Sequence, residues 1–352
     1  MLVFQWFDEG WGVMLKVAVV GVNKIGKLHC QFYHQHNDTE LVAVCDLIKN
    51  RAQQMAETYH TACYTDLEKM LETEEIDIVS IATAGVENGS HHFKPAMTAI
   101  KAGKDVLVEK PISNSIEEAR EMVQFATHQN VRFVCNLNHR FVPIASKGKN
   151  LIDNGSLGAL LFLNMKLTIQ NPKDMTEWFH MRALHPHSID VMRYFGGEIR
   201  RVQSFMTKAP ERNTWSTVSI NMEFASGAVG HLTGSYDMSR IHPIEYCEVG
   251  GTKGRFEIDN VFERLLFFPH NRDEILVEHN SIFSDIGSFH DTFLYRFADF
   301  IQQVKEGVPP AEMNASSHDA LAVQEVIEAA IQSQKNGGEV VDISNVQGKS
   351  NV

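Results

Sequence analysis

Between residues 14 and 136, short apolar runs alternate with segments in which apolar residues recur at helical spacing. The runs lie at residues 16–20, 41–45, 76–82, 106–108 and 131–135. Ile25, Leu28 and Phe32 mark one face of the helix that is predicted after the first run. Short buried strands that alternate with helices are typical of a parallel sheet covered on both faces. The pattern therefore predicts a doubly wound α/β domain over residues 14–136.

The pattern changes after residue 137, where predicted strands outnumber helices. Apolar and polar residues alternate over 217–224, which predicts a strand with one solvent-facing side, and Ser226-Gly227 then turns the chain into a second strand. Further strands are expected at 245–249, 255–259 and 265–268. A last helix at 319–334 buries Ala320, Val323, Ile327 and Ala330 and stops near Gly337. We expect residues 137–336 to form an α+β domain on a large, mostly antiparallel open sheet.

Length and composition narrow the class of protein. A chain of 352 residues suggests two domains, flanked here by an N-terminal extension (1–13) and a C-terminal tail (337–352). The formal net charge of −12 argues against nucleic acid or an anionic membrane as partner, and no apolar run approaches the ~18 residues of a membrane span. The five cysteines lack close pairing and the first residues lack a basic region, so we expect a cytoplasmic protein.

A glycine-bounded turn follows the first strand, in the order Gly21-Val-Asn23-Lys24-Ile25-Gly26. Glycines at such a turn let the backbone approach a pyrophosphate, whose charge then faces the N-terminus of the helix. Asn23 stands where the usual fingerprint has its middle glycine, and asparagine tolerates a positive φ better than most residues. The turn predicts a dinucleotide site of the Rossmann type, with a plain strand-to-helix turn as the alternative.

Asp46 ends the second predicted strand, where a carboxylate accepts hydrogen bonds from the adenosine ribose. Leu47 and Ile48 follow it, with no adjacent arginine to receive a 2′-phosphate, so Asp46 favours NAD over NADP. The alternative is a strand-end cap.

Glu109-Lys110-Pro111 places a charged pair at the carboxyl edge of the parallel sheet, where ligands of α/β proteins bind. Pro111 restricts Lys110 to an extended backbone, which aims an ammonium that can hydrogen-bond a substrate hydroxyl. A surface salt bridge at the end of a strand is the alternative interpretation.

Together these motifs resemble the glucose–fructose oxidoreductase, inositol 2-dehydrogenase and MocA (Gfo/Idh/MocA) family. The resemblance rests on Gly21–Gly26, Asp46, 81–111, Asn138-His-Arg-Phe141 with Pro143, and His187-Ser-Ile-Asp190. It implies a nicotinamide-dependent oxidoreductase that acts on a secondary alcohol of a sugar, polyol or cyclitol. It also implies a homodimer or homotetramer formed through the open sheet.

The resemblance also assigns roles to single residues. Lys110 would hold the reacting hydroxyl, His187, at the start of a helix, would exchange its proton, and Asp190 would bind substrate or orient His187. The cofactor set adds these residues to the turn and Asp46: Arg51, Ala82, Thr83, Glu109, Lys110 and Asn138. The substrate set is His92, Arg140, Trp178, Arg182, His185 and His187.

Two departures from the family pattern stand out. Many members carry an aspartate four residues before this histidine, and here the position is Ala183, so His185 and Arg182 are candidates to supply the missing polar contacts. The loop at 84–92 is longer than the family's usual connection, although His92 keeps its place before Ala96. We expect a longer loop at the mouth of the nicotinamide pocket to narrow substrate choice.

The sequence also raises three other interpretations: a metal site, a phosphorylated or nucleotide-linked substrate, and a non-catalytic protein. His180, His185 and His187 lack a further ligand at a zinc-like spacing, so no metal is expected. Arg182, Arg193 and Lys166 are candidate ligands for a phosphorylated or nucleotide-linked sugar. A third possibility is a non-catalytic, NAD-binding regulatory protein of the same fold, against which the retention of Lys110 and His187 argues.

Overall fold

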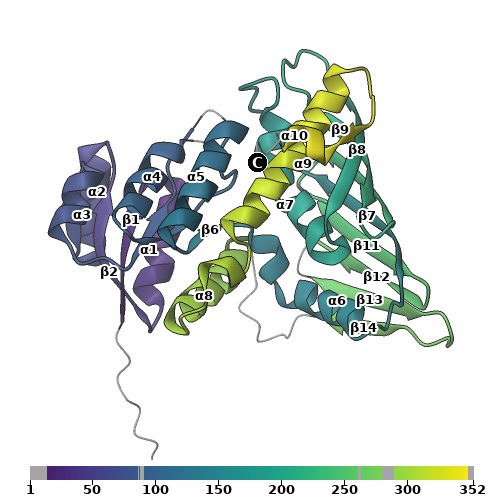
Figure 1. Ribbon diagram of the computed structural model, residues 1–352, viewed down its shortest axis with the longest axis horizontal. Coiled ribbons are helices and arrows are strands. Elements are labelled where there is room, and N and C mark those ends of the chain that lie inside the picture. The colour runs from purple at the N-terminus through teal and green to yellow at the C-terminus, as the bar shows by residue number, and fades with distance from the viewer. Residues whose placement is uncertain (1–13, 86, 88–90, 261–262, 280–288, 348–352) are drawn as a thin grey trace, which may run out of the picture.

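The computed structural model describes residues 14–85, 87, 91–260, 263–279 and 289–347. Two sheets lie side by side, and long helices fill the space between them (Figure 1). The predicted N-terminal extension lies outside the described residues, as do residues 86 and 88–90 of the predicted long loop.

The first sheet has six strands in the order β3-β2-β1-β4-β5-β6, and every neighbouring pair is parallel. Its strands are β1 (Leu15–Val20), β2 (Thr39–Cys45), β3 (Ala62–Tyr64), β4 (Ile78–Ile81), β5 (Asp105–Val108) and β6 (Phe133–Cys135). Its helices are α1 (Lys24–Gln35), α2 (Lys49–Tyr59), α3 (Leu67–Thr73), α4 (Phe93–Lys101) and α5 (Ile116–Gln129). This strand order is that of a dinucleotide-binding Rossmann fold, so the predicted doubly wound sheet is confirmed.

Side chains of β1 alternate between two hydrophobic clusters, as expected for a strand buried on both faces. Val17 and Val19 pack on the side of α1 and α2, whereas Ala18 and Val20 pack on the side of α4 and α5. The prediction that Ile25, Leu28 and Phe32 mark one face of α1 is only partly correct. Ile25 is exposed, because it lies in the first turn above the edge of the sheet, and the buried residues of the helix are Gly26, His29, Cys30, Phe32 and Tyr33.

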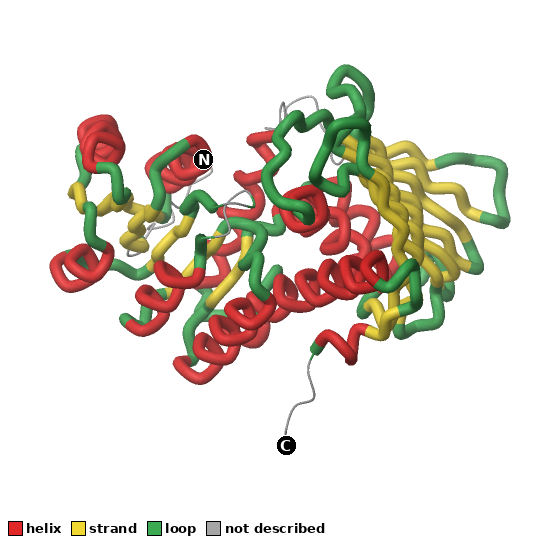
Figure 2. The backbone as a smooth tube through the Cα atoms, turned by 90° about the horizontal axis from the view of Figure 1, so that it is seen from above, coloured by secondary structure: helices red, strands yellow, loops and turns green. Residues whose placement is uncertain are grey.

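The second sheet has nine strands in the order β14-β13-β12-β11-β7-β10-β9-β8-β15. They are β7 (Leu160–Thr168), β8 (Ile199–Thr207), β9 (Thr217–Phe224), β10 (Val229–Ser235), β11 (Glu245–Gly251), β12 (Gly254–Asp259), β13 (Arg264–Pro269), β14 (Leu276–His279) and β15 (Val341–Asp342). Only β7 and β10 run parallel among the described pairs, which confirms the mostly antiparallel prediction. Figure 2 shows helices on the side of this sheet that faces the first domain.

The helical segments of the second half comprise η1 (Asn138–Phe141), α6 (Pro143–Asp153), α7 (Phe179–Gly196), η2 (Phe289–Asp291), α8 (Thr292–Lys305), η3 (Pro310–Glu312), α9 (Ser317–Lys335) and α10 (Ile343–Val346). The four residues predicted to line the inner face of α9 are all buried. The segment expected to be a C-terminal tail contributes β15, which pairs with β8, and α10.

Helix α8 crosses the boundary expected between the two domains. Phe293, Phe297 and Phe300 belong to the hydrophobic cluster that contains Val17 and Val19 of β1. The ring of Phe297 lies 4.8 Å from that of His29 and 4.9 Å from that of Tyr33, centroid to centroid. A helix that follows the second sheet in the chain therefore completes one face of the first.

Candidate active site

The turn between β1 and α1 needs both of its glycines. Gly21 has a φ of +84°, and a Cβ on it would lie 2.8 Å from the backbone of Thr83. A Cβ on Gly26 would lie 1.9 Å from the carbonyl oxygen of Gly21. Asn23 has a φ of −81° and precedes the helix in an extended conformation, so its tolerance of a positive φ is not used.

Asp46 closes this turn from the neighbouring strand. Its Oδ2 accepts a hydrogen bond from the backbone N–H of Val22 at 3.0 Å, and its Oδ1 accepts one from that of Ile48 at 2.9 Å. The carboxylate is 8% exposed, whereas Leu47 beside it is 91% exposed. A buried carboxylate next to an open apolar surface fits a ribose flanked by an adenine ring.

The other predicted cofactor residues lie around the same edge of the sheet. Asn23, Lys24, Ile25 and Arg51 are exposed, whereas Ala82 is buried at the end of β4. Thr83 is half-buried and donates its hydroxyl to the carbonyl oxygen of His91 at 2.7 Å. The glycine turn, the buried carboxylate of Asp46 and the exposed first turn of α1 together fit a bound dinucleotide.

Glu109 belongs to a buried polar network at the end of β5. Its Oε1 lies 2.9 Å from Nε2 of His29 and accepts a hydrogen bond from Asn136 at 2.5 Å, while Nδ1 of His29 lies 2.8 Å from the Ser80 hydroxyl. Burial, the largest single influence, would raise the pKa of Glu109, but its contacts with His29, Asn136 and Lys110 together outweigh it, so the pKa is lowered. Glu109 therefore stays ionised beside Lys110.

Lys110 links the first domain to the second. Its ammonium donates a hydrogen bond of 2.9 Å to the backbone carbonyl oxygen of Ala183 in α7, and the Lys110–Pro111 peptide bond is cis. Burial lowers the pKa of Lys110, and the charge of Glu109 opposes this effect. Ala183, which stands where the family pattern led us to expect an aspartate, thus offers its backbone carbonyl to the lysine.

His187 lies in the middle of α7 and not at its start, because the helix already begins at Phe179. Pro186 is inside the helix; it has no N–H to donate, and its ring disturbs the preceding turn, to which Ala183 belongs. The His-x-His pair is therefore helical rather than extended, and this proline obscured the helix in the sequence.

The imidazole of His187 is 4% exposed and stacks on that of His139, with ring centroids 4.2 Å apart and planes inclined by 10°. Burial, followed by the charges of His139 and Lys110, lowers its pKa well below the ordinary value. His187 is consequently neutral at physiological pH, the state in which an imidazole accepts a proton.

Asp190 is fully buried one turn after His187, and both of its carboxylate oxygens accept hydrogen bonds from Arg140. Burial raises the pKa of Asp190 although Arg140 opposes the shift. Arg140 also reaches Asp319 at 3.3 Å and lies over the ring of Tyr194. The predicted pair of Asp190 and Arg140 is thus brought together, and its described contacts tie η1 to α7 and α9.

Two other predicted residues lie buried at the domain junction. Asn138 donates a hydrogen bond to the hydroxyl of Thr292. The Nδ1 atom of His92 lies 2.8 Å from the carbonyl oxygen of Pro111, and burial lowers the pKa of His92 to about 4. The imidazole of His92 is therefore neutral, and its contact with Pro111 holds the segment that follows Lys110.

The remaining predicted substrate residues have protein partners. Arg182 binds both carboxylate oxygens of Glu328 and reaches Glu87 at 3.3 Å. His185 lies beneath the second sheet with its Nε2 3.0 Å from that of His180, and burial lowers its pKa to about 3. Trp178 is 9% exposed and stacks with Trp215. Each of these three residues therefore already has a protein partner, and their predicted contact with substrate stays a prediction.

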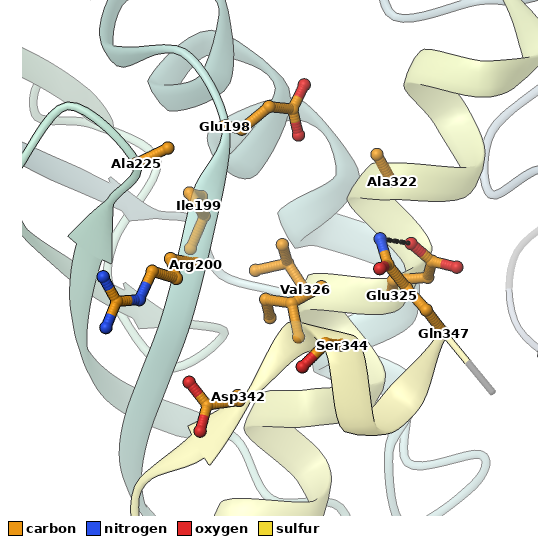
Figure 3. Close-up of a pocket in the computed structure, with 11 residues that line it drawn as sticks. Glu198, Ile199, Arg200, Ala225, Ala322, Glu325, Val326, Asp342, Ser344 and Gln347 are labelled. Carbon is orange, nitrogen blue, oxygen red and sulfur yellow. Dashed lines mark hydrogen bonds between the residues drawn. The ribbon is translucent and has the colours of Figure 1, made fainter. Parts of the chain in front are cut away.

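Two cavities lie elsewhere in the molecule. One, of about 350 Å³, lies between the start of β8, α9 and α10, where Gln347 donates a hydrogen bond to Glu325 (Figure 3). The other, of about 260 Å³, is lined by Arg140, Tyr194 and Asn314. Neither is lined by Lys110 or His187, so the candidate site is defined by its side-chain chemistry.

Two further features concern the described residues. They contain no group of three or more histidine, cysteine or acidic side chains arranged to hold a metal ion. Among their helices, none is long and apolar enough to cross a membrane.

The sequence interpretation missed three residues of this centre. Glu245, 4% exposed on β11, lies 3.1 Å from Nδ1 of His139. His139 lay within the quoted motif without a role, and no role was predicted for Pro186. A histidine between Asn138 and Arg140 was the available signal for His139, whereas nothing near Glu245 in the sequence connects it to the site.

A Rossmann domain, a charged strand end and a buried histidine on a facing helix define an NAD-binding oxidoreductase of two domains. A family model described as oxidoreductase family, NAD-binding Rossmann fold, matches residues 15–137, and the GFO/IDH/MocA C-terminal domain matches residues 146–257. The chain belongs to the Gfo/Idh/MocA oxidoreductase family.

Individual relatives agree with this assignment. Myo-inositol 2-dehydrogenase of Thermotoga maritima is 25% identical over 84% of this chain and 90% of its own length. The scyllo-inositol 2-dehydrogenase (NAD⁺) of Bacillus subtilis is 27% identical over 92% of this chain and 95% of its own. A levoglucosan dehydrogenase in complex with NADH and L-sorbose superposes with a TM-score of 0.85 at 19% identity, over 94% of this chain and 99% of its own. The predicted fold, the resemblance and the NAD-dependent oxidoreductase class are confirmed.

Proposed function

We propose that this chain interconverts a secondary alcohol and its ketone on a sugar, polyol or cyclitol. The hydrogen bond from Lys110 to the carbonyl oxygen of Ala183 carries the proposal, because it brings an ammonium from the cofactor domain onto the helix that bears His187. Bound NAD supplies the nicotinamide that accepts the hydride of the alcohol carbon or returns it. The named inositol dehydrogenases, and the neighbour complexed with L-sorbose, support this substrate class.

Lys110 and His187 have different roles in the proposed reaction. Lys110 donates a hydrogen bond to the reacting hydroxyl, and its charge favours the alkoxide. His187, held neutral by burial, takes the hydroxyl proton during oxidation and gives it back during reduction. Arg140 and Asp190 hold the part of α7 that carries His187, and Asp46 and the glycine turn bind the cofactor.

A phosphorylated or nucleotide-linked substrate has less support. Arg182 is bound by Glu328, Arg193 contacts Glu198 and Asp319, and Lys166 is exposed on the open face of β7. These three cations do not converge on Lys110, and the first two already have acidic partners. The neutral polyol remains the proposed substrate.

We also propose that the open face of the second sheet joins copies of the chain into a dimer or tetramer. Phe205 and Val229 are more than half exposed there, on neighbouring parts of one sheet. Light scattering of the purified protein measures the assembly, and a monomer at micromolar concentration would contradict it.

The free cysteines are in keeping with the reducing cytoplasm as its compartment.

The experiment that tests the function is NADH formation from NAD⁺ across free sugars, inositols, sugar acids and sugar phosphates. One class should be oxidised by the wild type, and Lys110→Met should abolish its turnover while NAD affinity stays within a few-fold. Lys104→Met, at the start of the same segment and away from the site, is the matched control. NAD binding without turnover of any class would favour the regulatory alternative, and full activity of Lys110→Met would remove Lys110 from the mechanism.

A further inference from the structure

Two contacts from the first domain reach neighbouring residues in the first turns of α7. Lys110, which follows β5, donates its hydrogen bond to the carbonyl oxygen of Ala183. Glu87, on the connection between β4 and α4, accepts a hydrogen bond of 3.3 Å from Nη1 of Arg182. The carbonyl group that the lysine contacts therefore belongs to the residue that follows an arginine held by the same domain.

Glu87 makes its contact from a buried position. Its side chain is 1% exposed, and its other carboxylate oxygen, Oε1, accepts a hydrogen bond from the hydroxyl of Thr176. Thr176 precedes α7, and its carbonyl oxygen accepts a hydrogen bond from the N–H of Phe179, the first residue of the helix. Both oxygens of one carboxylate of the first domain thus bind the beginning of α7.

We infer that Glu87 is a positioning residue that holds the first turns of α7 against Lys110. Lys110 comes from one domain and His187 from the other, so their separation depends on how α7 lies against the first domain. Misplacement of reacting groups by about 1 Å can cost roughly 10²-fold in rate. The inference rests on the proposed function for its catalytic meaning, whereas the contact between the domains is independent of it.

The second partner of Arg182 separates the role of Glu87 from folding. Glu328 of α9 accepts hydrogen bonds of 2.8 and 3.0 Å from Nε and Nη2 of Arg182, and it belongs to the same domain as the arginine. Without Glu87, the guanidinium therefore still has a carboxylate partner, so no unpaired cation is left in the junction. We expect variants of Glu87 to fold and to lose the link between the domains.

The first measurement follows hydride transfer with the substrate class that the panel identifies. Glu87→Ala should lower kcat roughly tenfold, with Tm and the Kd for NAD close to those of the wild type. Glu87→Gln should lie between the two, because its amide oxygen can still accept a weaker, uncharged hydrogen bond from Arg182. Glu198→Gln is the matched control: it removes a carboxylate from Arg193, another arginine of α7, but within the second domain, and should leave kcat unchanged.

The second measurement needs no substrate. Acetylation of Lys110 in the NAD-free protein is followed by mass spectrometry over a range of pH, which separates the reactivity of the free amine from its pKa. The contact with Ala183 shields the amine. Its limiting reactivity, relative to that of the exposed Lys253, should therefore rise several-fold in Glu87→Ala and stay at the wild-type value in Glu198→Gln.

The two measurements distinguish the inference from the proposed function. A more reactive Lys110 together with a silent substrate panel would overturn the proposed function and support the link between the domains. Unchanged reactivity of Lys110 in folded Glu87→Ala would overturn the inference whatever the panel shows, and so would a wild-type kcat in that variant. If Glu87→Ala fails to fold, Thr176→Val decides by the same two measurements, because it removes only a hydroxyl that binds Glu87.

Discussion

The cofactor turn and the reaction centre are built differently. The cofactor turn is held within one domain, by two glycines and by Asp46 of the adjacent strand. The reaction centre takes Lys110 from the first domain and His139, His187 and Glu245 from three elements of the second. Changes in the turn should therefore alter cofactor affinity, whereas changes in the centre should alter the chemical step.

The largest effect is expected for His187→Gln, which removes the proposed base. It should lower kcat by roughly 10²–10⁴-fold and leave the Kd for NAD within a few-fold. Because its pKa is lowered, wild-type His187 is neutral down to more acidic pH than an ordinary histidine, so wild-type oxidation should persist on the acid side. The pH profile of kcat checks both points, with His231→Gln on the open sheet face as control. An unaltered kcat would place the base elsewhere.

The next largest effect is expected for Gly26→Ala, and it concerns NAD affinity rather than kcat. Its methyl group would lie 1.9 Å from the carbonyl oxygen of Gly21, so the turn must open. A strain of about 1–3 kcal/mol corresponds to roughly a 5–150-fold loss of NAD affinity, measured by calorimetric titration. Lys27→Ala, exposed further along α1 and outside the predicted cofactor set, is the control, and retained affinity in Gly26→Ala would break the comparison.

Asp46→Ala should weaken NAD about tenfold and narrow the preference over NADP. It removes the acceptor proposed for the ribose together with the hydrogen bonds to the N–H groups of Val22 and Ile48. Asp66→Ala is a matched control, since it removes the cap of α3 in the same domain and should lower Tm without changing NAD affinity. Equal loss for both nucleotides would refute the ribose role.

The smallest effect is expected for Pro186→Ala, which restores an N–H inside α7. The new N–H would bond the carbonyl oxygen of Arg182, four residues earlier, and tighten the turn next to the Ala183 carbonyl that Lys110 contacts, so kcat should fall a few-fold while Tm holds or rises. Stopped-flow measurement of hydride transfer detects this. A normal rate in the variant would show that Pro186 does not help to position Lys110.

The same contrast explains what could be predicted from the sequence. Strand order, the glycine turn and Asp46 follow from local patterns, because parallel strands end at one edge and short motifs recur there. Pro186 concealed the first turns of α7, before His187. The partners of Arg140 and Arg182 lie far away in sequence, so both arginines were expected to bind substrate. Glu245 is more than a hundred residues from His139, and only the pairing of β11 with β7 brings it to the centre.

The position of helix α8 affects how domains can be exchanged between these enzymes. Since Phe293, Phe297 and Phe300 complete the hydrophobic cluster around β1, a fragment cut near residue 137 would lose part of its own interior. A chimera that exchanges the second domain for that of a relative therefore needs two junctions, one after β6 and one before α8. With a single junction, the donor's aromatic side chains would have to match a surface with which they never coevolved.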